Sequence, residues 1–119
     1  YWPGELTVVF SANESFTQKF DKNMKTIGVR IPKNKITLEI IKNSGGILLT
    51  TSANISGERA VTDIKDMSEV LLSEVDGIIT DNSILTGVPS TIIKYVEGEI
   101  EILREGNINI EKIKQLMKG

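Results

Sequence analysis

The sequence predicts an α/β (α+β) fold, a twisted mixed β-sheet flanked by helices. Three observations lead to this prediction. Segments rich in β-branched residues alternate with segments whose apolar residues recur at helical spacing. The pair Glu97-Gly98, typical of a tight turn, separates two strand-like segments near the C-terminus. The length of 119 residues fits one domain, so residues 1–119 are expected to belong to a single unit.

Six segments have the apolar and β-branched composition of strands. The last of them alternates Glu and Ile with period two, which indicates one wet face and one buried face. The third is a short apolar run that is expected to be buried, and the fourth is expected to form another short strand. In chain order the expected strands are residues 6–11, 26–31, 47–50, 78–81, 91–96 and 99–104.

Four segments are expected to be helical. In the second, isoleucines recur at positions 36, 40 and 41, Asn34 is placed to cap the start, and Gly45-Gly46 ends the helix. The third begins near Asp63 and is expected to bury its apolar side chains, namely Ile64, Met67, Val70 and Leu71. The first is a turn at residues 15–20, and the last is an amphipathic helix at residues 109–117.

Composition excludes several classes of chemistry. The chain contains no Cys and no His, so thiolate nucleophiles, Ser-His-Asp triads and the HExxH zinc signature are absent. A net charge of −2 argues against a free-standing nucleic-acid binder. No apolar run is long enough for a membrane helix, so no membrane partner is expected. The start at Tyr1 has neither an initiator Met nor a secretory leader, so we expect a cytoplasmic piece of a longer chain.

Arginines are scarce, and two of the three close expected strands. These are Arg30 and Arg104, whereas most cations of the chain are lysines. Ligand sites of open sheets lie at strand ends, and a guanidinium offers a planar fork for a carboxylate or phosphate. The alternative is a pair of surface arginines in weak ion pairs.

Two polar segments are further candidates for a binding site. Residues 51–57 place small hydroxyl and amide side chains directly after an apolar run, which suits close approach to a phosphate or ribose. Residues 87–91 form a rigid turn that presents Ser90 and Thr91 at the start of the last hairpin. The alternative for both segments is an ordinary polar turn. Neither contains a Walker P-loop pattern.

Five blocks in a fixed order resemble the YrdC-like family of threonylcarbamoyl-adenylate synthases over nearly the whole chain. They are Trp2-Pro3-Gly4 with Thr7, and residues 28–32, 51–57, 89–93 and 102–106. The Ser-Ala-Asn-x-Ser-Gly element in the third block is the most specific. The resemblance implies a YrdC-like fold whose N-terminal part is absent, so that residues 1–119 are the C-terminal portion of one domain.

The resemblance also implies an activity. Members of the family convert L-threonine, bicarbonate (or CO₂) and ATP into threonylcarbamoyl-AMP and pyrophosphate, with Mg²⁺ expected on the phosphates. Other proteins then transfer the group to adenosine 37 of tRNA. By position, the L-threonine contacts implied are Arg30, Thr50 and Ser90. The implied ATP contacts are Thr26, Ser52, Asn54, Arg104 and the backbone at Ala60, and no residue acts as a covalent nucleophile.

One departure from the family pattern limits the expected activity. Family members carry a Lys-x-Arg element that completes the phosphate site, and no Lys-x-Arg occurs in this sequence. We therefore expect the chain alone to be a weak binder without catalysis. Three alternatives remain at this point: a double-stranded-RNA-binding or ribosome-related protein of the same fold, a carbamoyl-transfer paralogue, and a purely structural module.

Overall fold

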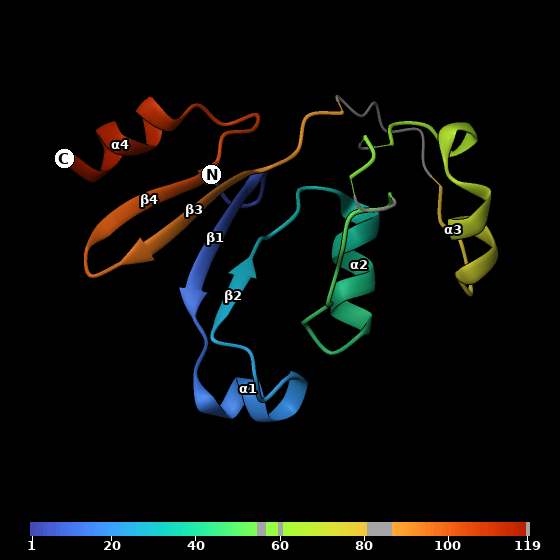
Figure 1. Ribbon diagram of the computed structural model, residues 1–119, viewed down its shortest axis with the longest axis horizontal. Helices are drawn as coiled ribbons and strands as arrows, with labels where there is room; N and C mark the ends of the chain where they lie inside the picture. Colours follow the sequence, from blue (N-terminus) through green and yellow to red (C-terminus); the bar gives the residue numbers. More distant parts are fainter. Residues whose placement is uncertain (55–56, 60, 81–86, 119) are drawn as a thin grey trace.

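A computed structural model describes residues 1–54, 57–59, 61–80 and 87–118. Helices and strands alternate in the first part of the chain, and a β-hairpin and a helix end it (Figure 1). In order they are β1 (Leu6–Ser11), α1 (Glu14–Phe20), β2 (Thr26–Val29), α2 (Lys35–Asn43), the 3₁₀ turn η1 (Ile64–Asp66), α3 (Glu69–Glu74), β3 (Thr91–Val96), β4 (Glu99–Arg104) and α4 (Ile110–Lys118).

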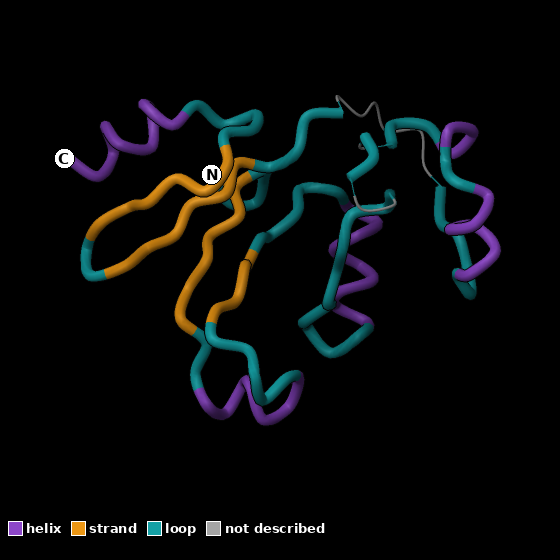
Figure 2. The backbone as a smooth tube through the Cα atoms, viewed as in Figure 1, coloured by secondary structure: helices purple, strands orange, loops and turns teal. Residues whose placement is uncertain are grey.

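The four strands form one mixed sheet in the order β2-β1-β3-β4 (Figure 2). Strand β1 is antiparallel to β2 and parallel to β3, and β3 is antiparallel to β4. These directions bring the first residues of β1 and β3 to the same end of the sheet as the last residues of β2 and β4. The predicted mixed sheet is confirmed, and four strand termini meet at one end.

One face of this sheet packs against α4 and forms the hydrophobic core. Leu6 and Ile93 from the sheet pack against Ile113 of α4, and all three are buried. Partly buried residues surround them: Val8, Ile100, Ile102 and Ile108. Every second residue of a strand points to the same face, so the residues between these core positions point to the opposite face.

The capped helix predicted after Asn34 is confirmed as α2. The Asn34 Oδ1 accepts a hydrogen bond from the Thr37 amide at 2.9 Å, and the helix ends at Asn43, just before Gly45-Gly46. The amphipathic helix predicted near the C-terminus is confirmed as α4, which buries Ile110 and Ile113. Within the described residues, no helix is both long and apolar enough to cross a membrane.

Two predicted short strands, the first of them expected to be buried, are wrong within the described residues. Residues 47–50 and 78–80 form no strand, and Leu49 and Ile79 are 64% and 68% exposed. A strand needs a neighbour to pair its backbone N–H and C=O groups, and these segments have no strand partner in the described part of the chain. Position 81 lies outside the described residues.

The helix predicted from Asp63 is also wrong in its length and its burial. Asp63 does act as a cap, since its carboxylate accepts from the Lys65 amide at 3.0 Å, but it caps only the short turn η1. Extended backbone at Met67 separates η1 from α3. Ile64 and Val70 are 39% and 66% exposed. Met67 and Leu71 are half-buried, so the apolar spacing is present, but the described chain covers this apolar face only in part.

Strand β2 ends at Val29, two residues earlier than predicted. The Gly4 amide donates to the Ile31 carbonyl at 2.8 Å, so the chain still runs beside β1 after the regular ladder ends. This irregular pairing leaves the Arg30 side chain at the end of the sheet.

The molecule is less compact than a typical domain of the same length. Its radius of gyration is 16.0 Å, whereas a compact domain of this length has a radius of about 13–14 Å. Figure 1 shows why: α2 and α3 stand beside the sheet, across a gap, and do not lie on it.

Candidate functional site

The end of the sheet where four strand termini meet carries three of the predicted site residues, Arg30, Ser90 and Arg104. The register places Thr7 opposite Ile92 and Gly28 opposite Val9. Cross-strand partners point to the same face, and these positions alternate with the core residues. Thr7, Gly28 and Ser90 therefore lie on the face that α4 does not cover.

Ser90 is held by neighbours on both sides. Its Oγ lies 2.9 Å from Thr7 Oγ1 of β1. Its carbonyl oxygen accepts two hydrogen bonds from Arg104 of β4, from Nε at 3.0 Å and from Nη2 at 2.9 Å. The Arg104 Nη2 also donates to Ser90 Oγ at 3.3 Å. The predicted pair Ser90 and Arg104 is therefore in direct contact.

A β-bulge puts Arg104 on this face. Ile93 pairs with Ile102 and Ile92 pairs with Arg104, so Leu103 is an extra residue in β4. Simple alternation from the core residue Ile102 would have directed Arg104 to the α4 side. The extra residue reverses this, because Arg104 then shares the face of its partner Ile92.

Arg30 lies at the same end of the sheet, beyond β2. Its Nε donates to the Gly4 carbonyl at 2.8 Å. Among the described residues its two terminal nitrogens have no hydrogen-bond partner, and the side chain is exposed. Arg30 lies two positions after Gly28 in the chain, so it points to the same face as Thr7. The Arg30 guanidinium is thus anchored through its Nε–H, and its two terminal nitrogens are available to a ligand.

The polar loop after α2 forms a second, separate feature. Thr50 and Ser52 are exposed. The Asn54 Nδ2 donates to the Glu58 carbonyl at 3.2 Å, and Asn54 lines an open hollow of about 410 Å³. The other lining residues are Glu58, Arg59, Val61, Thr62, Asp66 and Ser68.

The structure therefore brings together only part of the predicted site. Arg30, Ser90 and Arg104 share one end of the sheet, and none of them lines the Asn54 hollow. Thr26 stands at the other end of β2, opposite Ser11. Ala60 lies outside the described residues.

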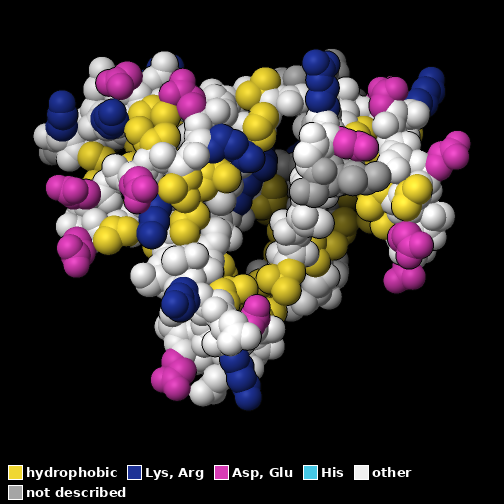
Figure 3. All heavy atoms as spheres, in the orientation of Figure 1, with side chains coloured by type: hydrophobic (Ala, Val, Ile, Leu, Met, Phe, Trp, Pro, Cys, Tyr) yellow, Lys and Arg dark blue, Asp and Glu magenta, His cyan; other side chains and the backbone are white. Residues whose placement is uncertain are grey.

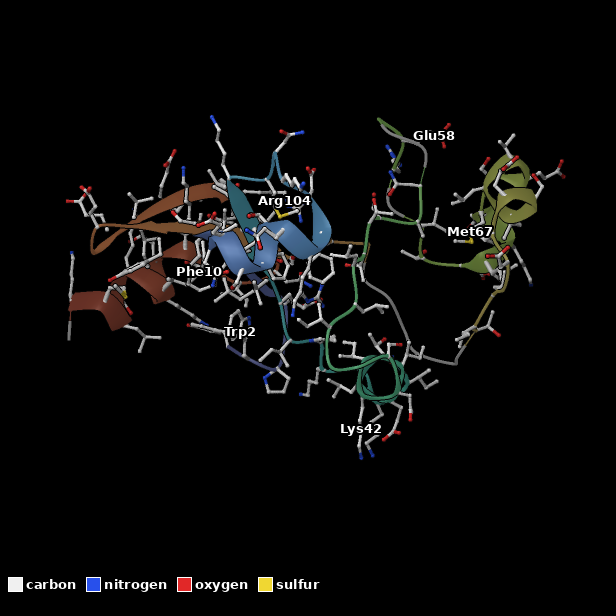
Figure 4. The ribbon with its side chains drawn as sticks, turned by 90° about the horizontal axis from the view of Figure 1, so that it is seen from below. Trp2, Phe10, Lys42, Glu58, Met67 and Arg104 are labelled. Carbon is white, nitrogen blue, oxygen red and sulfur yellow. The ribbon has the colours of Figure 1, made fainter. Side chains whose placement is uncertain are left out.

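The two features nevertheless face the same side of the molecule. Figure 4 shows Phe10 and Trp2 on the α4 side of the sheet, Arg104 on the other side, and Glu58 across a gap from Arg104. In Figure 3 this face is hollowed between the sheet and the helices, and Lys and Arg side chains gather on the sheet side of the hollow. A ligand in this hollow would meet cations from the sheet and amide and hydroxyl groups from the loop.

Two residues at the sheet end differ from the sequence expectations: the expected presentation of the Thr91 hydroxyl at the 87–91 turn is wrong, and no structural role was expected for Gly106. Thr91 is completely buried, with an exposure of 0%, and Gly106 contacts the backbone of Pro89 and Ser90. A signal for Thr91 was present: it alternates with Ile93 on the core face, and a polar side chain there must find hydrogen-bond partners. Nothing in the sequence indicated the tight contact at Gly106.

Comparison with known proteins supports a family assignment. The family model described as "Sua5_yciO_yrdC: Telomere recombination" matches residues 1–106. The chain is 31% identical over 117 residues to the threonylcarbamoyl-AMP synthase of Pyrococcus abyssi, covering 98% of this chain and 34% of that protein. It is 35% identical over 113 residues to a putative threonylcarbamoyl-AMP synthase of Methanocaldococcus jannaschii, covering 95% and 52%.

A solved structure has the same fold. The crystal structure of P. abyssi Sua5 complexed with L-threonine matches with a TM-score of 0.84 and 31% identity, over 98% of this chain and 34% of that chain. The chain thus spans about a third of the P. abyssi protein and about half of the M. jannaschii protein.

Proposed function

The chain belongs to the Sua5/YciO/YrdC family, and we propose that it supplies part of the substrate site of a threonylcarbamoyl-AMP synthase. The reaction consumes L-threonine, bicarbonate or CO₂, and ATP, and yields threonylcarbamoyl-AMP and pyrophosphate. Other proteins would use this product to modify tRNA. Two findings support the proposal: relatives named as this synthase match 95–98% of the chain, and the related P. abyssi structure is described as complexed with L-threonine.

One structural observation carries the proposal: two guanidinium groups with different hydrogen-bonding capacity lie at one end of the sheet. Arg30 keeps both terminal nitrogens available, which suits the two oxygens of the threonine carboxylate. Arg104 already donates from Nε and Nη2 to the Ser90 carbonyl, so Nη1 is left to donate to a phosphate oxygen. Ser90 and Thr50 are proposed as further threonine contacts.

The nucleotide is proposed to bind toward the loop. Ser52, Asn54 and the backbone at Ala60 would contact it from the helix side, and Thr26 from the sheet. The exposed amide and hydroxyl groups of this loop suit ribose and phosphate oxygens. Threonine and nucleotide would then meet in the hollow between sheet and helices.

The chemistry needs charge stabilisation more than a nucleophile. The threonine nitrogen attacks CO₂, forms an N–C bond and loses a proton, which gives a carbamate. A carbamate oxygen then attacks the α-phosphorus of ATP, and the bond from that phosphorus to the bridging oxygen of pyrophosphate breaks. Guanidinium groups can hold the reactants in line and offset the charge of the phosphoryl oxygens. This suits a chain that lacks Cys and His.

Mg²⁺ is proposed to arrive on the phosphates of ATP. Within the described residues, no group of three or more His, Cys, Asp or Glu side chains could hold a metal ion. A dedicated protein site for the ion therefore does not fit these residues. No step above depends on it.

A direct assay tests the proposal. The chain is mixed with ATP, L-threonine and bicarbonate, alone and together with the remaining part of the family domain taken from a longer relative. Pyrophosphate release and the mass of threonylcarbamoyl-AMP are measured. We expect product only in the completed sample. A completed, folded sample without product would contradict the synthase, and rapid turnover by the chain alone would contradict its incompleteness.

A further inference from the structure

We propose that Thr91 is a positioning residue, whose buried hydroxyl acts with the bare backbone of Gly106 to set Arg104 on Ser90. The effect on substrate binding rests on the proposed function. The positioning itself can be tested without any ligand.

Thr91 occupies an unusual place for a polar side chain. It is the only buried polar residue in the part of the chain that the structure describes. It is the first residue of β3, opposite Leu6 of β1, and its amide donates to the Glu5 carbonyl at 3.0 Å. Its side chain shares the core face with Ile93. A valine would fit such a place by shape, so the hydroxyl needs an explanation.

The Thr91 hydroxyl makes all of its hydrogen bonds with the loop that follows β4. Its Oγ1 donates to the Ile108 carbonyl at 2.7 Å. It accepts from the Gly106 amide at 2.9 Å and from the Ile108 amide at 3.1 Å. A hydroxyl has one hydrogen and two lone pairs, and all three have partners here. Removal of the oxygen would leave two amides and a carbonyl without their partner.

Gly106 makes this close approach possible. A Cβ added at Gly106 would overlap the Pro89 carbonyl oxygen, and it would lie 2.6 Å from the Ser90 carbonyl carbon and 2.8 Å from its oxygen. A backbone carbonyl cannot swing aside as a flexible side chain can. Any side chain at position 106 would therefore push the loop away from Ser90.

These contacts converge on the Ser90 carbonyl. One side of this group touches Gly106, and its oxygen accepts both Nε and Nη2 of Arg104. Thr91 fixes the loop, the loop fixes the Ser90 peptide, and the peptide fixes the guanidinium. Loss of the Thr91 hydroxyl should thus loosen Arg104, although Thr91 lies on the opposite face of the sheet.

The test measures the Arg104 side chain directly by NMR. The chain has three arginines and so three Nε–H signals, and Arg104→Lys identifies the signal of interest. The exchange of this proton with water is compared in the unsubstituted chain, Thr91→Val, Thr91→Ser and Ile113→Val. The last is the control, because it weakens the core at α4 without touching Ser90 or Arg104. The Arg30 signal is the internal reference.

We expect Thr91→Val to raise Arg104 Nε–H exchange about tenfold, which corresponds to about 1.4 kcal/mol. Thr91→Ser keeps the hydroxyl and should show the slow exchange of the unsubstituted chain. Ile113→Val should leave the Arg104 Nε–H exchange rate unchanged. A folded Thr91→Val with unchanged exchange would overturn the proposal. If Thr91→Val does not fold, Gly106→Ala decides: the same rise is expected, and an unchanged signal overturns it.

Titration with inorganic pyrophosphate separates the positioning from the proposed function. The same variants are used, each completed with the remaining part of the family domain, and Thr91→Val should bind about tenfold more weakly than the unsubstituted sequence. Equal affinity despite a loosened Arg104 would overturn the link to substrate binding. No pyrophosphate binding by the unsubstituted completed domain, with the exchange results as expected, would contradict the proposed function and support the positioning role.

Discussion

The two guanidinium groups at the sheet end differ in how many of their N–H groups are already bound. Arg30 is tied to the Gly4 carbonyl through Nε alone. Lysine cannot reproduce this arrangement, because an ammonium group has neither the Nε–H nor a planar pair of nitrogens. A conservative exchange at Arg30 is therefore an informative test of its role.

We predict that Arg30→Lys lowers L-threonine affinity of the completed domain about tenfold, and that Arg30→Ala removes detectable binding. The melting temperature should stay the same, because the side chain is exposed. Isothermal titration and thermal melting measure the two effects. Lys112→Ala is the control, since it removes an exposed cation from α4 on the other face. Normal threonine binding by Arg30→Ala would contradict the assigned role.

At the residue scale, sequence reasoning found the reactive groups but missed their supports. Arg104 and Ser90 were singled out, and they are hydrogen-bonded to each other. The sequence predicts a presented hydroxyl at Thr91, which is instead buried, and it predicts no role for Gly106, because a lone glycine has many uses. Their roles depend on contacts 15 to 17 residues apart in the chain.

At the element scale, α4 is the only described helix whose buried residues join the core cluster. Its length of nine residues is too short for stable helix formation by itself. Packing of Ile113 against Leu6 and Ile93 of the sheet must hold it in place. This dependence makes α4 a sensitive reporter of core packing.

We predict that Ile113→Ala destabilises the chain by about 2–4 kcal/mol, because it removes buried methyl groups and leaves a cavity. The matched change Leu116→Ala should cost less than about 0.5 kcal/mol, since Leu116 is 68% exposed on the same helix. Urea unfolding followed by circular dichroism gives both values. Equal effects at the two positions would show that α4 does not pack as described.

Element patterns correctly predicted the sheet and its hairpin, α2 and α4, but they also predicted strands at residues 47–50 and 78–81, and no strand forms at 47–50 or 78–80. Periodicity reports which face of a segment is apolar, not what covers that face. At residues 47–50 the apolar run is present and no strand forms. The bulge at Leu103 shows a second limit: strict alternation would have directed Arg104 to the core face, and only the pairing register shows otherwise.

At the scale of the whole molecule, the described chain leaves much apolar surface uncovered. Leu49, Val70 and Ile79 are each more than 60% exposed, and the radius of gyration exceeds that of a compact domain. Large exposed apolar patches mark interaction surfaces. Since the chain spans only a third to a half of its relatives, the remaining part of the family domain is the expected occupant.

We predict that the chain alone binds the dye ANS strongly, and that adding the remaining part of the domain abolishes this signal as the apolar surface becomes buried. Leu49→Asp should weaken that association about tenfold or more, since burying a leucine contributes about 1.5–3 kcal/mol. It should leave the stability of the isolated chain unchanged, because Leu49 is 64% exposed there. The control Leu116→Asp, at an exposed position on α4, should not change the association. Association is measured by titration and stability by urea unfolding. Unfolding of the isolated chain by Leu49→Asp, or an unchanged affinity, would contradict this account of the uncovered surface.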